Sequence, residues 1–261
     1  MPQQQYTRTM QLYRPTLPVT IVKSDLSLPR TRINIIVTVY NRCALFKSFL
    51  ETLVTRHGDQ NLRLVVADFA STECNVRSLL EESLPTSKFL YLSLPPPFVK
   101  VTALQKAIDL VSNSLDELLF MCDVDIVIPT GFFDILRRYH EACRAHFYRV
   151  VALLPDAAMH SRGRETIQGV QAMVPVCFSL YQDQPEVAIS TNGFWRTYGY
   201  AVIGIYKSDL MSVGGYREAT SWRGEDRDLI TRLVNAGYKI FRSQEVGLFH
   251  RWHEVLSSEH L

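Results

Sequence analysis

The sequence predicts an α/β fold with a mostly parallel sheet, and three observations support this prediction. A continuous β-branched run at 33–39 is typical of a strand that is buried on both faces. Apolar runs of this kind alternate with segments of helical periodicity along the first half of the chain. The chain has 261 residues, 47% of them hydrophobic and 21% charged, which is enough to bury a sizeable globular core.

The elements of the first half follow from local patterns. After a polar arm at 1–30, which prolines interrupt, we expect a single domain at 31–261. Helices are expected where apolar residues recur at helical spacing, and strands where short apolar runs stand between turn residues. The expected strands are 33–39, 62–67, 88–94 and 118–122, and the expected helices cover about 45–53, 72–82 and 104–111.

The second half of the chain is less regular. A polar stretch at 155–170 is expected to form a loop, and 170–180 a strand. An aromatic-rich stretch follows at 194–206. The pair Gly214-Gly215 predicts a turn. Apolar residues at 229–234 then predict a helix, with Gly237 in the position of a C-terminal cap.

Composition excludes several classes of protein. The formal charge of +2 argues against a nucleic-acid-binding protein, which usually has a strong basic bias. No apolar run reaches the roughly 18 residues that a membrane span needs, and the N-terminus lacks the apolar core of a signal peptide. The 5 cysteines are widely spaced without a CxxC pair, so we expect most of them to be small buried hydrophobes, with at least one free thiol.

Asp123-Val124-Asp125 is the most informative motif. It follows the fourth expected strand, and ligands of open α/β sheets bind beyond the carboxyl ends of strands. Buried carboxylates are costly unless they are paired, hydrogen-bonded or bound to a metal. In an extended segment, residues two apart point to the same side, so both acids could face one cation or one nucleotide. The alternative is a strand exit with two solvated acids.

The acidic pair Glu225-Asp226 precedes the helix expected at 229–234. Acids in the first turn of a helix are favoured by the helix dipole, so a simple capping role is one interpretation. The other is catalytic. Trp222 beside the flexible Gly224 could form a lid that stacks on a sugar, and an acid there could take a proton from an incoming hydroxyl.

Two histidines near the C-terminus, His250 and His253, are three residues apart. They could converge on one cation, and ligation by aspartate and histidine suits Mn²⁺ or a similar divalent ion. The absence of sulfur ligands argues against structural zinc. Two surface histidines without a ligand are the alternative.

A further polar cluster is expected where the first two strands end. Tyr40 and Arg42 follow the first strand and could hold a base and a diphosphate, and Asp68 ends the second and could accept from a base N–H. Purely structural roles are the alternative. The chain has no Gly-x-Gly-x-x-Gly after the first strand and no Gly-Lys-Ser/Thr loop, which argues against a dinucleotide dehydrogenase and a P-loop enzyme.

In this order, the motifs resemble those of the chondroitin synthase and chondroitin N-acetylgalactosaminyltransferase family, relatives of the β-1,4-galactosyltransferases with a GT-A fold. The resemblance runs from about Ile33 to His253 and is strongest at 120–126, from 193–196 through 215–216, and at 247–253. It implies a metal-dependent inverting transferase that moves a sugar, N-acetylgalactosamine above all, from a UDP-sugar to a glycan hydroxyl of a glycosaminoglycan-like acceptor. A galactosyl- or glucuronosyltransferase of the same fold is one alternative. A non-catalytic polymerising partner subunit is another. The resemblance also implies a possible hetero-complex with a related transferase.

The resemblance also implies roles for individual residues. It divides the domain into a nucleotide-binding half at 31–128 and an acceptor-binding half at 129–261. The implied roles are Asp226 as catalytic base with Glu225 beside it on the acceptor; Asp125, His253 and His250 at Mn²⁺; Tyr40, Arg42, Asp68 and Asp123 around the nucleotide; and Trp222 and Arg223 on the lid.

The chain departs from the family pattern at three places. Arg223 replaces a glycine of the lid, and this cation could pair with a uronate of the acceptor. Phe98-Val99-Lys100-Val101 replaces the family's Asn-Arg-Gly. No anchor or stem of the animal enzymes is recognisable.

The resemblance implies a location in the Golgi lumen, whereas the lack of a targeting segment leaves a cytoplasmic microbial enzyme as the alternative.

Overall fold

The computed structural model describes residues 31–58, 61–114, 117–140, 172–217 and 224–254. The arm expected at 1–30, the loop expected at 155–170 and the lid residues Trp222 and Arg223 lie outside the described residues. Within the described ranges, no helix is both long and apolar enough to cross a membrane.

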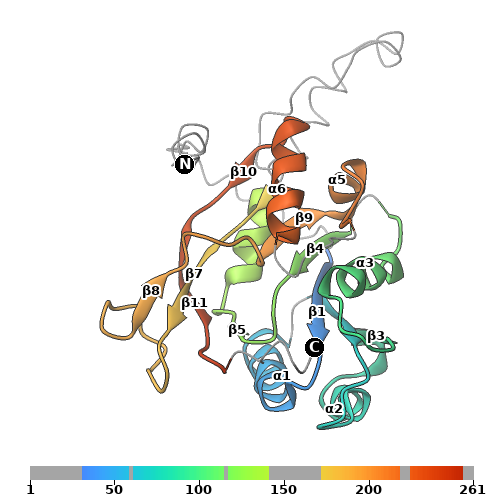
Figure 1. The fold of residues 1–261 in the computed structure, drawn as a ribbon, viewed down its shortest axis with the longest axis vertical. Helices are drawn as coiled ribbons and strands as arrows, with labels where there is room; N and C mark the ends of the chain where they lie inside the picture. The colour runs from blue at the N-terminus through green and yellow to red at the C-terminus, as the bar shows by residue number, and fades with distance from the viewer. Residues whose placement is uncertain (1–30, 59–60, 115–116, 141–171, 218–223, 255–261) are drawn as a thin grey trace. The chain divides into compact units, whose positions relative to one another are not determined.

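The main sheet confirms the predicted α/β class with mostly parallel strands (Figure 1). Strand β1 is buried along its whole length, as the β-branched run predicted. It pairs in parallel with β2 on one side and β4 on the other, and β9 is the antiparallel member between β4 and β6. The sheet order is β10 (Ile240–Phe241), β6 (Ala172–Met173), β9 (Ile203–Tyr206), β4 (Leu118–Met121), β1 (Ile33–Val39), β2 (Leu62–Asp68) and β3 (Phe89–Ser93).

A second, smaller sheet carries the C-terminal strand. Its order is β5 (Ile126–Val127), β11 (Gln244–His250), β7 (Val176–Leu180) and β8 (Gly193–Trp195). The single strand expected at 170–180 is therefore wrong: β6 and β7 belong to different sheets, and Pro175 stands between them. Proline has no N–H to donate to a ladder, so it interrupts the pairing where the chain passes from one sheet to the other.

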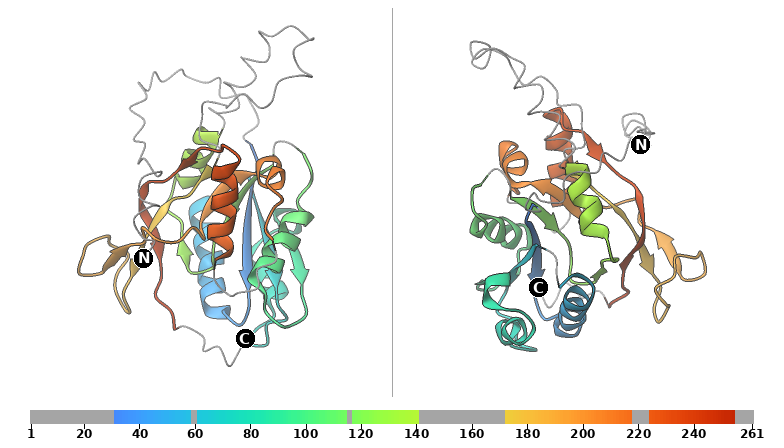
Figure 2. Two further views of the ribbon diagram at one scale, coloured as in Figure 1. Left: turned by 45° about the horizontal axis from the view of Figure 1, so that its top comes forward. Right: turned by 180° about the vertical axis from the view of Figure 1, so that it is seen from behind.

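Helices cover both faces of the main sheet, and Figure 2 shows them from two further sides. One buried cluster joins β1 and β2 to α1 and α2, and a second joins the other face to α3, α5 and α6. The expected helices are present, although α2 begins only at Val76 because Asn75 caps it by accepting from the Ser78 N–H. The bounds are α1 Cys43–His57, α2 Val76–Ser83, α3 Lys100–Leu110, α5 Lys207–Ser212 and α6 Glu225–Asn235.

Helix α6 ends as its sequence predicted. Gly237 has φ +83° and donates its N–H to the Val234 carbonyl, while Tyr238 donates to the Leu233 carbonyl. This pair of bonds defines a Schellman cap, in which glycine is favoured because it adopts positive φ without steric cost. The Gly214-Gly215 turn is confirmed as well, with φ +87° and +64°.

The cysteines only partly follow the prediction of buried hydrophobes. Cys122 and Cys177 are buried free thiols, as expected. Cys43 and Cys74 instead form a disulfide that joins the start of α1 to the loop before α2. Sequence spacing could not reveal this pair, because the two residues come together only when the ends of β1 and β2 lie side by side.

Removing the disulfide should destabilise the protein. A cross-link between residues 31 apart restricts the unfolded chain, and by the loop-closure relation it is worth about 3–4 kcal/mol. We expect the Cys43→Ser, Cys74→Ser double variant to lose free energy of unfolding of this order in urea titrations. Cys177→Ser, at a buried free thiol, is the control for changing a cysteine without breaking a cross-link. An unchanged unfolding midpoint in the double variant would contradict the prediction.

Candidate active site

The predicted site residues that fall within the described ranges gather at the carboxyl edge of the main sheet. Strands β1, β2 and β4 run in parallel, and their register places Val39 beside Asp68 and Ile36 beside Met121. The segments that follow these strands therefore meet at one edge, where open α/β sheets bind ligands. Strand β11 reaches the same edge, because His250 pairs with Ile126 just after the Asp123–Asp125 motif.

Asp125, His250 and His253 form a cluster that could hold a metal ion. The Asp125 Oδ2 atom lies 2.9 Å from Nε2 of His253 and 3.6 Å from Nε2 of His250, and one donor atom from each residue lies within 4.8 Å of the others. Asp125 is 7% exposed, and its Oδ1 atom is buried without a hydrogen-bond partner among the described residues. Such an orphaned buried oxygen is costly unless a cation occupies the site.

The far sides of both imidazoles are held in a way that suits metal ligation. Nδ1 of His253 lies 2.9 Å from the Glu254 carbonyl, which can only accept, so Nδ1 carries a proton in this contact and Nε2 faces Asp125. Nδ1 of His250 lies 3.0 Å from Ser179 Oγ, and Ser179 pairs with His250 across β7 and β11. Metal-binding histidines usually have an oxygen partner of this kind on the other nitrogen. Sequence patterns alone did not identify Ser179.

The charges of Asp125, His250 and His253 shift one another's pKa values. The hydrogen bond with Asp125 raises the pKa of His253. Burial lowers the pKa of His250, although Asp125 opposes this. Burial would raise the pKa of Asp125, but the His253 hydrogen bond and the neighbouring His250 bring it below its usual value. The site thus favours an ionised carboxylate that needs a positive partner, either a proton on Nε2 or a cation. The set of one carboxylate and two imidazoles, with coordination positions left open, fits a divalent first-row ion.

The structure separates the two acids of the Asp-Val-Asp motif. Residues 124 and 125 form a turn after β4, so the alternation of an extended strand does not apply, and the two carboxylates do not share one cluster. Asp123 instead forms an ion pair with Lys100, whose Nζ lies 2.7 Å from Oδ1. Lys100 was not among the predicted site residues, although it stands in the Phe98–Val101 departure from the family pattern.

Lys100 interacts with the charges of both the Asp-Val-Asp motif and the acids of α6. Burial would lower its pKa, but Asp123, Asp226 and Glu225 raise it well above the usual range. Lys100 is therefore a cation at neutral pH, and it offsets part of the negative charge of three carboxylates.

Asp226 has a raised pKa. It lies in the first turn of α6, behind Gly224 with φ +122°. Burial raises its pKa to about 6, with a further contribution from Glu225, while Lys100 opposes the shift. A carboxyl group whose pKa lies close to neutral pH is better suited to proton transfer than one of ordinary acidity.

The expected nucleotide residues end two neighbouring strands, and intramolecular contacts already hold two of them. Tyr40 stacks on Phe98 with ring centroids 5.6 Å apart. Asp68 is buried: Oδ1 accepts from the N–H and hydroxyl of Ser71, and Oδ2 accepts from the Tyr91 hydroxyl. Asp68 therefore also organises the loop after β2. Arg42 precedes α1, and its charge acts on His253.

A family model described as "Chondroitin N-acetylgalactosaminyltransferase" matches residues 2–261. Human "Chondroitin sulfate N-acetylgalactosaminyltransferase 2" is 29% identical over 265 residues, which cover 97% of this chain and 46% of that protein. Mouse "Chondroitin sulfate synthase 3" is 29% identical over 248 residues, covering 86% of this chain and 24% of that protein. The chain thus spans less than half the length of these relatives.

Two solved structures confirm the GT-A fold that the sequence resemblance implied. A mannosyltransferase from Pyrobaculum calidifontis, in complex with GDP-Man and Mn²⁺, matches with a TM-score of 0.55 and 17% identity over 88% of this chain and 59% of its own. TarS of S. aureus, in complex with UDP-GlcNAc, matches with a TM-score of 0.60 and 13% identity over 86% of this chain and 59% of its own. At these identities the likeness concerns the fold alone.

Proposed function

Because this chain belongs to the chondroitin N-acetylgalactosaminyltransferase family, we propose that it is a metal-dependent, inverting glycosyltransferase. The donor is a UDP-sugar, UDP-N-acetylgalactosamine above all, and the acceptor is a hydroxyl of a glycosaminoglycan-like glycan. The observation that carries the proposal is the cluster of Asp125, His250 and His253, in which the buried carboxylate has an orphaned oxygen.

The proposed reaction is a single displacement at the anomeric carbon. Asp226 takes the proton of the acceptor hydroxyl. The oxygen of that hydroxyl forms the new glycosidic bond to the anomeric carbon, while the bond from the anomeric carbon to the diphosphate breaks. Mn²⁺, held by Asp125, His250 and His253, would supply a Lewis acid for the departing diphosphate. Lys100 keeps Asp226 from becoming too weak an acid, because its positive charge favours the ionised carboxylate.

The remaining residues divide between donor and acceptor. Tyr40, Arg42 and Asp68 are proposed to surround the uridine diphosphate, with Asp123 near the ribose. Glu225 is proposed to contact the acceptor beside Asp226. Trp222 and Arg223 are proposed to belong to the lid, as the sequence resemblance implied.

The cellular location is proposed from the relatives and from the disulfide. Disulfides persist in oxidising compartments, so the Cys43–Cys74 pair supports a secretory location such as the Golgi lumen. A hetero-complex with a related transferase is a further proposal, and it applies both to an active enzyme and to a polymerising partner subunit. The cluster at Asp125 favours an active enzyme over a non-catalytic subunit, because a subunit without activity has no need of a metal site.

A UDP-release assay with a panel of UDP-sugars tests the proposed function. We expect Mn²⁺-dependent release that is fastest with UDP-N-acetylgalactosamine and an acceptor ending in a uronic acid, and that needs the acceptor. A faster reaction with UDP-galactose or UDP-glucuronate would support the alternative donors. Binding of UDP-sugars without release from any of them would instead indicate the non-catalytic subunit.

A further inference from the structure

The segment that carries the two cluster histidines needs support from outside the cluster. His250 ends β11 and His253 follows after two residues that belong to no helix or strand. Both imidazoles must nevertheless face Asp125. One backbone bond helps: the Arg251 N–H donates to the Asp125 carbonyl at 2.9 Å, which extends the β5–β11 pairing by one step. This backbone bond fixes the start of the segment but does not by itself orient its side chains.

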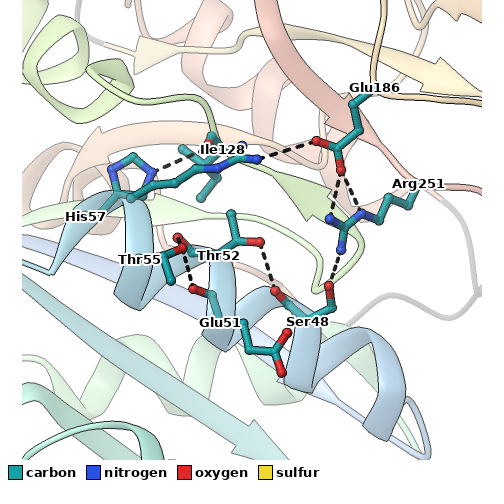
Figure 3. A network of polar contacts seen from close by, with 9 residues as sticks. Ser48, Glu51, Thr52, Thr55, His57, Ile128, Glu186 and Arg251 are labelled. Carbon is teal, nitrogen blue, oxygen red and sulfur yellow. Dashed lines mark hydrogen bonds and ion pairs between the residues drawn. The ribbon is translucent and has the colours of Figure 1, made fainter.

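The side chain of Arg251 contacts Glu186 and Ser48, and so fastens the segment to the β7–β8 connection and to α1 (Figure 3). Nη2 and Nε both donate to Oε1 of Glu186, at 2.8 and 3.2 Å, and Nη1 donates to Ser48 Oγ in α1. Glu186 lies in the connection between β7 and β8, and its Oε2 is 3.6 Å from Arg56 of α1. We call Arg251, Glu186 and Ser48 the Arg251 clamp.

We propose that Arg251 is a positioning residue for the metal cluster, acting through the Arg251 clamp. Successive residues of an extended segment point to opposite sides, so fixing Arg251 on the α1 side directs His250 to the other side, toward Asp125. The clamp also anchors the chain two residues before His253. This inference rests on the metal site of the proposed function but not on which sugar is transferred.

The clamp differs from an ordinary surface ion pair. The side chains of Arg251 and Glu186 are only 28% and 32% exposed, and all three guanidinium nitrogens of Arg251 are engaged. Planar guanidinium groups that are held by several acceptors lose little freedom for each bond formed. The contact also joins three segments that are distant in the sequence. Arg77 and Glu81 provide the contrast: their pair is 66% and 47% exposed and lies within the single helix α2.

The test is the affinity for Mn²⁺, measured by calorimetry with Mn²⁺ alone and with Mn²⁺ in saturating UDP. Arg251→Met and Glu186→Ala should each weaken Mn²⁺ binding by about tenfold, the lower end of the effect of residues that orient metal ligands. The double variant should bind Mn²⁺ no more weakly than Arg251→Met alone, since Arg251→Met already removes the interaction with Glu186. Arg77→Met and Glu81→Ala are the matched controls and should bind Mn²⁺ like wild type. Ser48→Ala removes one contact only and should give a smaller loss.

Circular dichroism and thermal unfolding without metal separate positioning from stability. A positioning role predicts weaker Mn²⁺ binding at a temperature where every variant is fully folded. Folded variants with wild-type affinity would overturn the inference while leaving the metal site intact, and so would losses that add in the double variant. If Arg251→Met does not fold, wild-type affinity in Ser48→Ala and Glu186→Ala would overturn it too. Wild-type protein that binds no Mn²⁺, even with UDP, would overturn the metal site and this inference together.

Discussion

Replacing Asp226 with asparagine is expected to lower turnover by about 10²- to 10⁴-fold, the usual contribution of a positioned general base. Asparagine is nearly the same size but cannot take a proton from the acceptor hydroxyl. Binding of the UDP-sugar should persist, because the nucleotide residues lie on other elements. Steady-state kinetics gives the turnover, and calorimetry gives the donor affinity. Near wild-type turnover in Asp226→Asn would exclude Asp226 as the base.

The pH dependence of turnover gives a second check on Asp226. Its pKa of about 6 means that the wild-type rate should fall as the pH drops through 6, since the protonated carboxyl cannot act as a base. The residual rate of Asp226→Asn should lack this step. Because burial raises the pKa of Asp226, keeping this carboxyl group ionised in the folded protein costs free energy at every pH above its pKa in the unfolded chain. Asp226→Asn removes this cost, so its free energy of unfolding at pH 7 should be no lower than that of wild type.

Asp228 provides the matched control for Asp226. It lies in the same first turn of α6, but its carboxylate pairs with Arg232 at 2.7 Å and is 49% exposed. Asp228→Asn removes the same charge from the same helix end and should keep turnover. An equal loss in both variants would indicate a general effect on α6 rather than proton transfer by Asp226.

Replacing Asp125 with asparagine is expected to abolish Mn²⁺-dependent binding of UDP. Asp125 is the carboxylate of the cluster, and in the variant only a neutral amide oxygen and the two imidazoles could hold the ion. Oxygen ligands with negative charge are the ones that Mn²⁺ prefers. The measurement is calorimetry of UDP with and without Mn²⁺. An unchanged affinity for Mn²⁺ with UDP would show that the cluster does not bind the metal.

Asp109→Asn is the control for this second variant. Asp109 lies at the exposed face of α3, where it accepts from Gln105 at 2.8 Å, away from the cluster. The variant should bind Mn²⁺ and UDP like wild type. A chelator should reproduce the effect of Asp125→Asn in the wild-type protein and have little further effect on the variant.

Local patterns in the sequence identified the fold class and several site residues. The buried strand β1 and the capping Gly237 could be predicted because short-range rules govern them. The grouping of Asp125 with His250 and His253 was instead implied by the family resemblance, and the structure places these three side chains together. Periodicity reveals which face is buried, and acids or histidines at strand ends are rare enough to be informative. By contrast, residues 170–180 looked like one strand, since periodicity does not show which sheet a segment joins.

The order of residues along the chain is enough to show which chemical groups are available, namely carboxylates and imidazoles at the ends of particular strands. Which of these groups pair with one another depends on the folded arrangement. It placed Lys100 on Asp123, separated Asp123 from Asp125, and set Ser179 behind His250. These outcomes depend on contacts between segments far apart in the chain, where the cost of burying each charge selects its partner. No local pattern contains that information.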